Sequence, residues 1–262
     1  MSHPATPAFG KWRSFFWPIH RFELKKIVPM LLMFFFINFV YSILRNAKDA
    51  LVVTAPGAGA EVLAFLKVAG VLPAAFIFML IYAKLSNSLS KKQLFYTAIA
   101  PFPIFFLLFI LVLYPAKDTL HPYSLGLTLR EAFPVGLHGL VAAIENWTFS
   151  LFYIMAELWG SVVLSLMFWG FANDITHVNE AKRFYALFGL GANIALIFIK
   201  PFNKLIKYYI STMGTVQDKW FYEQAFIVGA VVLCSIAIVW IYHWINKDVL
   251  TDSRFYSQTE KK

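Results

Sequence analysis

Residues 150–174 read SLFYIMAELWGSVVLSLMFWGFAND, an almost wholly apolar stretch that nevertheless contains the carboxylate of Glu157. A transmembrane helix needs about 20 predominantly apolar residues, and this run is long enough. Glu157 follows Trp147 by ten residues, or roughly 15 Å along a helix. The stretch therefore predicts a membrane-spanning helix with an acid near the bilayer midplane, where ionisable groups are costly and usually functional.

The composition places this helix in a membrane protein. Of the 262 residues, 60% are hydrophobic and 14% are charged, whereas soluble domains have about 45–50% and about 25%. The apolar residues gather into six runs of bilayer length without the alternation of barrel strands, so the spans are expected to be helical. We predict an all-α integral membrane protein with six transmembrane helices. The predicted spans are residues 27–44, 63–83, 94–114, 147–172, 184–205 and 225–245.

Basic residues predict the orientation of these spans. With both termini placed in the cytoplasm, the inner segments hold twice as many Lys and Arg residues as the outer segments, which is the bias found in membrane proteins. The expected layout is an interfacial N-terminal segment (1–26), a six-helix domain (27–245) and a cytoplasmic tail (246–262). The net charge of +9 then reflects topology, and no nucleic-acid partner is expected because no soluble basic face exists.

The sequence gives no indication of an enzyme, a cofactor or a metal site. The single cysteine, Cys234, lies in the sixth predicted span and is expected to be packing, and the six histidines lack metal-ligand spacing. Neither the nucleophile–base pair of a membrane-embedded enzyme nor the charge rings of a channel is found. The longest connection, residues 115–146, contains several Pro and Gly residues and is interpreted as an outer loop.

Three polar residues inside spans are the candidate site. They are Glu157, Lys67 in the second span, where Gly70 and Pro73 are expected to bend the helix, and Asn193 in the fifth. Each also has a structural interpretation: Lys67 snorkels to the interface, Glu157 forms a structural ion pair or stays protonated, and Asn193 bonds between helices. An acid and a base in one bundle indicate a polar cavity, and six helices with both ends inside match half of a twelve-helix transporter.

Four strings then resemble the nucleotide transporters, or ATP:ADP antiporters, of chlamydiae, rickettsiae and plastids. The similarity runs from about Phe22 to the end. The resemblance implies the N-terminal half of a major-facilitator-like fold that exchanges ATP for ADP and phosphate across a bacterial inner membrane, or less readily a plastid inner envelope. The strings are RNAKDALVVTAPGAGAEVLAFLK (45–67), LIYAKLSNSLSKKQLFYT (80–97), FYIMAELWGSVVLSLMFWGFAND (152–174) and EAKRFYALFGLGANIALIF (180–198).

The resemblance also assigns roles to individual residues. Lys67 and Glu157 match two charged residues of the N-terminal half needed for transport, and Asn193 resembles a polar contact to the nucleotide. Arg45 and Lys48, in the RNAKD string, are candidates for the phosphate pathway. The chemistry agrees, because a triphosphate needs cationic donors and Lys67 is the best-placed cation within a span. Glu157 is expected to pair with a lysine in the empty site, to contact ribose or base, or to carry a coupled proton.

Two questions stay open at this point. Family members are about twice as long and have two six-helix halves, so the chain is expected to be a fragment of a longer gene product or a six-helix protein that dimerises. The substrate is the other question, since transport of other nucleotides or NAD, or proton-driven import, would use the same kind of pocket.

Overall fold

The structure, a computed structural model, describes residues 19–176, 178–212 and 219–251, and every regular element within these ranges is helical. Six helical stretches are long and apolar enough to cross a membrane, which confirms the prediction of an all-α protein with six spans. The major-facilitator-like arrangement stays a prediction. The six stretches are Arg21–Val53, Val62–Ser88, Lys91–Leu113, Trp147–Ile175, Glu180–Thr212 and Lys219–Val249.

Several stretches join α-helical segments to short 3-10 or π-helical segments. In chain order the segments are η1 (Arg21–Glu23), α2 (Leu24–Val53), α3 (Val62–Phe65), η2 (Leu66–Val71), α4 (Leu72–Ser88), α5 (Lys91–Ile99), α6 (Pro101–Leu108), η3 (Phe109–Leu113), α7 (Lys117–Leu120), α8 (Tyr123–Ala132), η4 (Val135–Leu137), α9 (His138–Glu145), α10 (Trp147–Leu158), η5 (Trp159–Phe168), α11 (Trp169–Ile175), α12 (Val178–Thr212), α13 (Lys219–Trp244) and η6 (Ile245–Val249).

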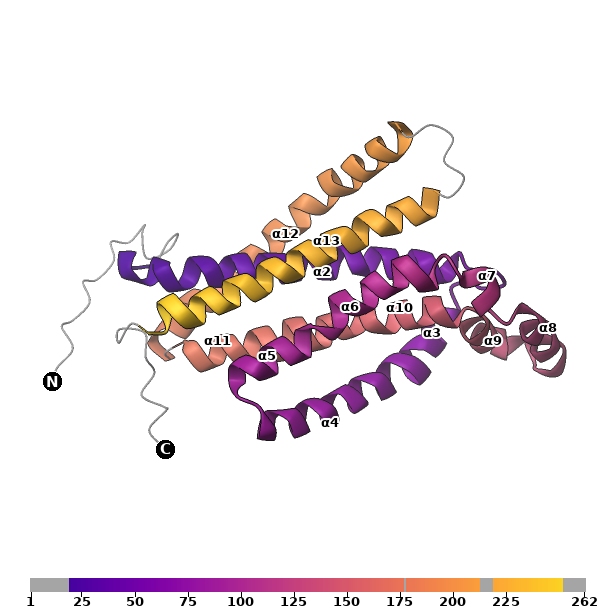
Figure 1. The fold of residues 1–262 in the computed structure, drawn as a ribbon, viewed down its shortest axis with the longest axis horizontal. Coiled ribbons are helices and arrows are strands. Elements are labelled where there is room, and N and C mark those ends of the chain that lie inside the picture. The colour runs from indigo at the N-terminus through magenta and orange to yellow at the C-terminus, as the bar shows by residue number, and fades with distance from the viewer. Residues whose placement is uncertain (1–18, 177, 213–218, 252–262) are drawn as a thin grey trace.

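The start of α2 and the end of α13 lie at one end of the bundle, here called the terminal end (Figure 1). The short helices α7, α8 and α9 lie at the opposite end (Figure 1), and we call residues 117–145 the cap and this end the cap end. Each long helix runs between the terminal end and the cap end (Figure 1).

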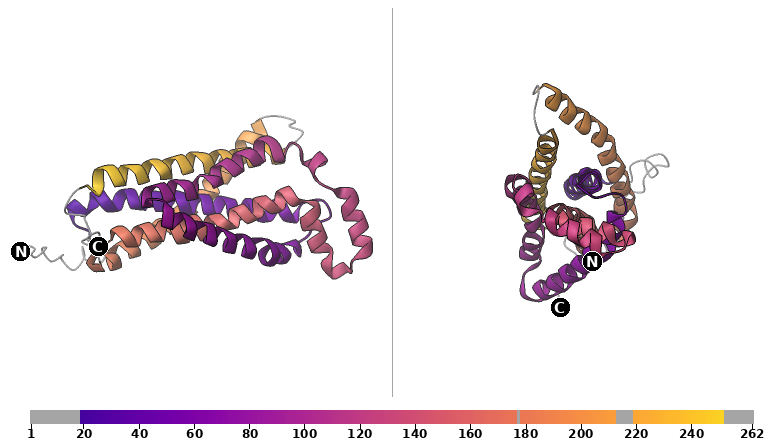
Figure 2. Two further views of the ribbon diagram at one scale, coloured as in Figure 1. Left: turned by 60° about the horizontal axis from the view of Figure 1, so that its bottom comes forward. Right: turned by 90° about the vertical axis from the view of Figure 1, so that its right-hand side faces the viewer.

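The helix α2 is the centre of the bundle. Figure 2 shows it among the other long helices, and it packs against α12, α13 and α10. Trp159 of η5 is fully buried and donates its indole N–H to the backbone carbonyl of Ile37 in α2 at 3.1 Å. Because membrane helices associate through close packing and interhelical hydrogen bonds, this contact holds the fourth stretch against the first.

Two crossed ion pairs join α2 and its 3-10 turn to α12 at the terminal end. Lys26 Nζ lies 2.8 Å from Glu180 Oε2, and Arg183 donates to both carboxylate oxygens of Glu23 at 2.9 and 2.7 Å. Lys26 is fully buried, and a buried charge of this kind needs its partner. The partners are 154 and 160 residues apart in sequence, so the sequence indicates bases at this end but no pairing.

The connection interpreted as a loop, residues 115–146, is instead largely helical, because the cap forms α7, α8, η4 and α9. Arg130 of α8 pairs with the buried carboxylate of Glu145 and donates to the carbonyl of Gly57 at 3.1 Å. Gly57 has a φ of 67°, in the left-handed region that favours glycine. The cap is thereby fastened to the turn between the first and second stretches.

The predicted spans are shorter than the helices. α2 continues to Val53, whereas the predicted first span ended at Leu44 and placed Arg45 and Lys48 in an outer segment. These residues stay helical and line a cavity, and whether they lie inside or outside the membrane stays a prediction. Where the membrane begins and ends along each helix stays a prediction, and residues 1–18 and 252–262 of the predicted N-terminal segment and tail lie outside the described residues.

The helix α4 lies along the outside of the bundle and none of its residues is buried (Figure 1). Many of its exposed side chains are large and apolar, as expected of a surface covered by lipid or by further protein. They include Leu72, Phe76, Ile77, Met79, Leu80 and Ile81.

Candidate functional site

A charged cavity of about 330 Å³ opens between the first, second and fourth stretches. Charged side chains within a membrane are expensive, so their convergence between membrane-length helices indicates a candidate functional site. α2 contributes Tyr41, Arg45, Lys48 and Asp49, η2 contributes Lys67 and Val71, and α10 contributes Glu157.

The α2 wall of this cavity follows from helical spacing. Tyr41, Arg45 and Lys48 recur at positions i, i+4 and i+7, which lie on one face of a helix. Opposite them, a Cβ atom at Gly160 of η5 would lie 2.6 Å from Cε2 of Tyr41. A glycine at position 160 therefore lets the Tyr41 ring pack against η5 at the edge of the cavity.

Lys48 is the cation that neutralises Glu157. Its Nζ lies 2.9 Å from Glu157 Oε1 and 2.6 Å from Asp49 Oδ1, and it sits 4.1 Å from the centre of the Tyr153 ring. The Lys48 side chain is 5% exposed and that of Glu157 is 25% exposed. A lysine partner for Glu157 was one of the predicted alternatives, and in the structure that lysine is Lys48.

Lys67 and Arg45 line the same cavity but are exposed. Within the described ranges, neither side chain forms an ion pair or hydrogen bond. The cavity thus holds three cations against the two carboxylates of Glu157 and Asp49. Two cations are left available to an anionic ligand.

The backbone around Lys67 departs from regular α-helix. Leu66–Val71 is a π-helical segment, and Pro73 follows at the start of α4. Proline lacks an N–H and cannot donate the usual hydrogen bond to the carbonyl one turn earlier, which accounts for the irregularity expected from Gly70 and Pro73. Such π-helical turns occur frequently at functional sites.

Asn193 is not brought to this cavity. It lies on α12 with an exposed side chain and is not among the cavity-lining residues. The structure therefore brings Lys67, Glu157, Lys48 and Arg45 together and leaves Asn193 on a separate surface.

Three lining residues, Tyr41, Asp49 and Val71, were missed by sequence reasoning, as was the ring of Tyr153. The i, i+4, i+7 spacing of Tyr41, Arg45 and Lys48 was the available signal. This spacing did not indicate a shared helix face at first, because the first span was predicted to end at Leu44.

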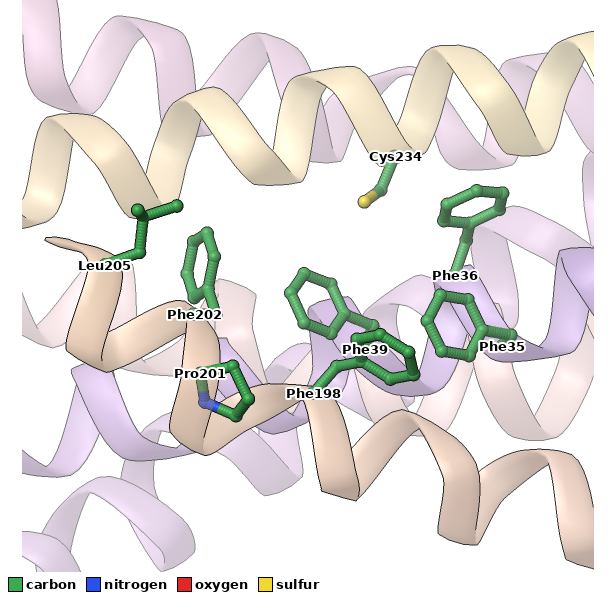
Figure 3. A pocket seen from close by; sticks show the side chains of 8 residues that line it. All are labelled: Phe35, Phe36, Phe39, Phe198, Pro201, Phe202, Leu205 and Cys234. Atoms are coloured by element: carbon green, nitrogen blue, oxygen red, sulfur yellow. The ribbon is translucent and has the colours of Figure 1, made fainter.

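A second, larger cavity of about 450 Å³ is apolar. It lies between α2, α12 and α13, and its walls are formed mostly by phenylalanine rings (Figure 3). Its lining residues are Phe35, Phe36, Phe39, Phe198, Pro201, Phe202, Leu205 and Cys234. With no charged group in its wall, this cavity offers nothing to a phosphate.

Comparison with known proteins decides the family. The family model described as TLC ATP/ADP transporter matches residues 2–262. The chain belongs to this family. The predicted resemblance to nucleotide transporters is thus confirmed, and with its six apolar helices the chain is a multi-pass membrane protein.

Curated relatives in this family come from bacteria and plastids. The chain is 54% identical to ADP,ATP carrier protein 1 of Chlamydia muridarum (strain MoPn / Nigg), over 100% of the chain and 50% of the relative. It is 50% identical to the chloroplastic ADP,ATP carrier protein 1 of Arabidopsis thaliana, over 91% of the chain and 38% of the relative. For ADP,ATP carrier protein 1 of Rickettsia bellii (strain RML369-C) the identity is 42%, over 93% and 48%.

The chain therefore spans about half the length of the curated relatives it matches, or less. No solved structure matches it.

Proposed function

We propose that the protein is a nucleotide transporter that exchanges ATP for ADP and phosphate by alternating access, with this chain forming the N-terminal six-helix half. The observation that carries the proposal is the charged cavity between membrane-length helices, in which Lys67 and Arg45 have no acidic partner among the described residues. The relatives named ADP,ATP carriers support the substrate assignment.

Within this function Lys67 and Arg45 bind the phosphate groups of the nucleotide. Charge-assisted hydrogen bonds to phosphate are short and about twice as strong as neutral ones. Lys48 holds Glu157 in place and neutralises it, so that the carboxylate does not repel the phosphates. Asn193 contacts the nucleotide from α12, once a second six-helix half, either of the same gene product or of a second copy, closes the transport path.

The setting is the inner membrane of a bacterium, with both chain termini in the cytoplasm. The lipid bilayer covers the exposed apolar side chains of α4 and the other outer helices. Exchange of substrates on the two sides then requires the cavity to open alternately to each, as in transporters built from two related halves.

Uptake measurements test this function. Vesicles containing the full-length gene product are loaded with ADP and given labelled ATP outside, and ATP should enter only when a nucleotide is present inside. Unlabelled nucleotides and NAD added outside establish the specificity by competition. Uptake that needs a proton gradient and no internal nucleotide would establish proton-coupled import in place of exchange, and uptake unaffected by every competitor would exclude nucleotide transport.

A further inference from the structure

The exposed side of α12 carries a polar stripe that the charged cavity does not use. Lys200, Lys204 and Lys207 are all exposed and recur at i, i+4 and i+7, and Asn193 precedes Lys200 by two turns on the same face. We call these four residues the α12 stripe. Another face of α12 packs against α2 through buried apolar residues: Phe184, Phe188, Ala195, Ile199 and Ile206.

The stripe is a surface of uncompensated positive charge. In the part of the chain that the structure describes, Lys200, Lys204 and Lys207 form no ion pair or hydrogen bond. The only carboxylate in α12 is Glu180, which is buried and paired with Lys26 at the terminal end. Nothing on α12 itself therefore offsets the three cations.

The stripe lies on the flank of α12 that faces away from α13. Phe198, Pro201 and Leu205 mark the α13 flank, since they line the apolar cavity shared with Cys234 of α13 (Figure 3). By the 3.6-residue repeat of a helix, Lys200 and Lys207 lie on the other side of the line of contact with α2.

The residues of α2 show how α13, α12 and the charged cavity are arranged around that helix. Phe36 lines the cavity shared with α13, Phe35 and Phe39 contact Phe198 and Phe202 of α12, and Arg45 lines the charged cavity. Passing around α2, the order is α13, then α12, then the charged cavity. The flank of α12 away from α13 is accordingly the flank on the side of α2 where the charged cavity lies.

The three lysines of the stripe are spaced along the axis of α12, starting near the cap end. Lys207 is five residues from the cap end of α12, and Lys200 lies roughly 10 Å further along the axis. Tyr208 and Tyr209 beside Lys207 are exposed aromatic residues of the kind that mark a membrane–water interface. An anion that enters from the cap end meets Lys207, Lys204 and Lys200 in turn, with Asn193 beyond them.

We propose that Lys200, Lys204 and Lys207 form a phosphate-binding site that captures the nucleotide at the cap end and passes it toward the charged cavity. This inference rests on the proposed nucleotide transport and adds a second, earlier site to it. Three cations on one wall raise the local concentration of a polyanion and speed its entry. The effect should increase with the number of charges on the nucleotide and decrease with salt.

The experiment uses the full-length protein in vesicles of zwitterionic phosphatidylcholine, in which all three lysines are changed to Gln. We expect the KM for ATP to rise about tenfold, with kcat within about twofold, a smaller rise for ADP, and a weaker dependence of KM on salt. The triple Lys→Arg variant, which keeps the charges, should retain a KM near that of the wild type. Lys219→Gln is the matched control, since Lys219 is an exposed lysine at the cap end of α13.

The same vesicles separate the possible outcomes. A KM for ATP that stays unchanged in the triple Gln variant, as in Lys219→Gln, would overturn the proposal. So would a rise in KM that appears only when anionic phospholipid is added to the vesicles, because the lysines would then bind lipid headgroups. Absence of nucleotide uptake by the wild-type protein would instead refute the proposed function itself.

Discussion

At the scale of single residues, Glu157 remains a candidate site residue, and its ion-pair partner in the structure is Lys48. The sequence predicts an acid near the bilayer midplane, and in the structure the ion pair with Lys48 at 2.9 Å supplies its compensating charge. Lys67, the cation with which it was grouped, lines the same cavity without a partner among the described residues. The two lysines thus differ: Lys48 is buried and paired with Glu157, whereas Lys67 is exposed.

Lys48→Gln should therefore destabilise the protein. The change leaves Glu157 without its cation, and a hydrogen bond to a charged group contributes about 1.5–3 kcal/mol. Adding Glu157→Gln to this variant should restore part of the loss, because no uncompensated carboxylate then remains. Unfolding midpoints in detergent for both single variants and the double variant measure the coupling. Strictly additive effects would show that the pair does not form.

At the scale of elements, the presence of six long helices could be predicted, but their ends, their 3-10 and π-helical segments and their contacts could not. The apolar runs indicated all six long helices, because bilayer length and composition are local properties of the sequence. The continuation of α2 through RNAKD was missed, since charged residues normally mark the end of a span and here they face a cavity. The helical cap and the pairs Lys26–Glu180 and Glu23–Arg183 depend on contacts between distant segments, which one sequence does not reveal.

The cap should show a pH-dependent stability through His121. Its ring nitrogens lie 2.7 Å from the Thr148 hydroxyl and 3.1 Å from the Tyr123 hydroxyl. Burial lowers the pKa of His121, and this effect outweighs the negative charges of Asp118 and Glu145, which act to raise the pKa. Because the folded pKa lies below the unfolded value near 6.5, stability is complete above about pH 6.5 and decreases as the pH falls below it.

Unfolding midpoints at about pH 7.5 and about pH 5.5 measure this effect, since the two values lie on either side of the unfolded pKa. His121→Gln removes the titrating ring and should show a smaller difference between the two midpoints than the wild type does. Equal differences in the two proteins would mean that His121 does not contribute.

At the scale of the whole molecule, the proposed transport path needs more than the one six-helix unit that the structure describes. The charged cavity is bounded by the first, second and fourth stretches, while α4 and the α12 stripe stay uncovered in the described ranges. The chain also spans half of the Chlamydia relative. A second unit that faces the charged cavity and the α12 stripe would complete the proposed path, and the two-half architecture, predicted both from six spans with both ends inside and from the resemblance, stays a prediction.

The 262-residue polypeptide by itself should accordingly fail to exchange nucleotides. ATP uptake into ADP-loaded vesicles measures this, with the full-length gene product as the positive control. Robust exchange by the isolated polypeptide would mean that two copies associate to form the complete transporter.

The predicted orientation places both ends of the chain in the cytoplasm, because the segments on that side hold most of the basic residues. A reporter enzyme fused after Lys262 should therefore be active only if it works in the cytoplasm, and a periplasmic reporter at the same point should be inactive. The opposite pattern would invert the topology and place the cap in the cytoplasm.

The central claim is that Lys67 binds the nucleotide phosphates, and the affinity of the Lys67→Gln variant for ATP tests it most directly. Loss of one charge-assisted hydrogen bond should weaken binding by the full-length protein about tenfold or more. Lys67→Arg should restore only part of the affinity, since a planar guanidinium does not place its donors where the ammonium did. Normal ATP affinity in Lys67→Gln, at normal expression, would contradict the account.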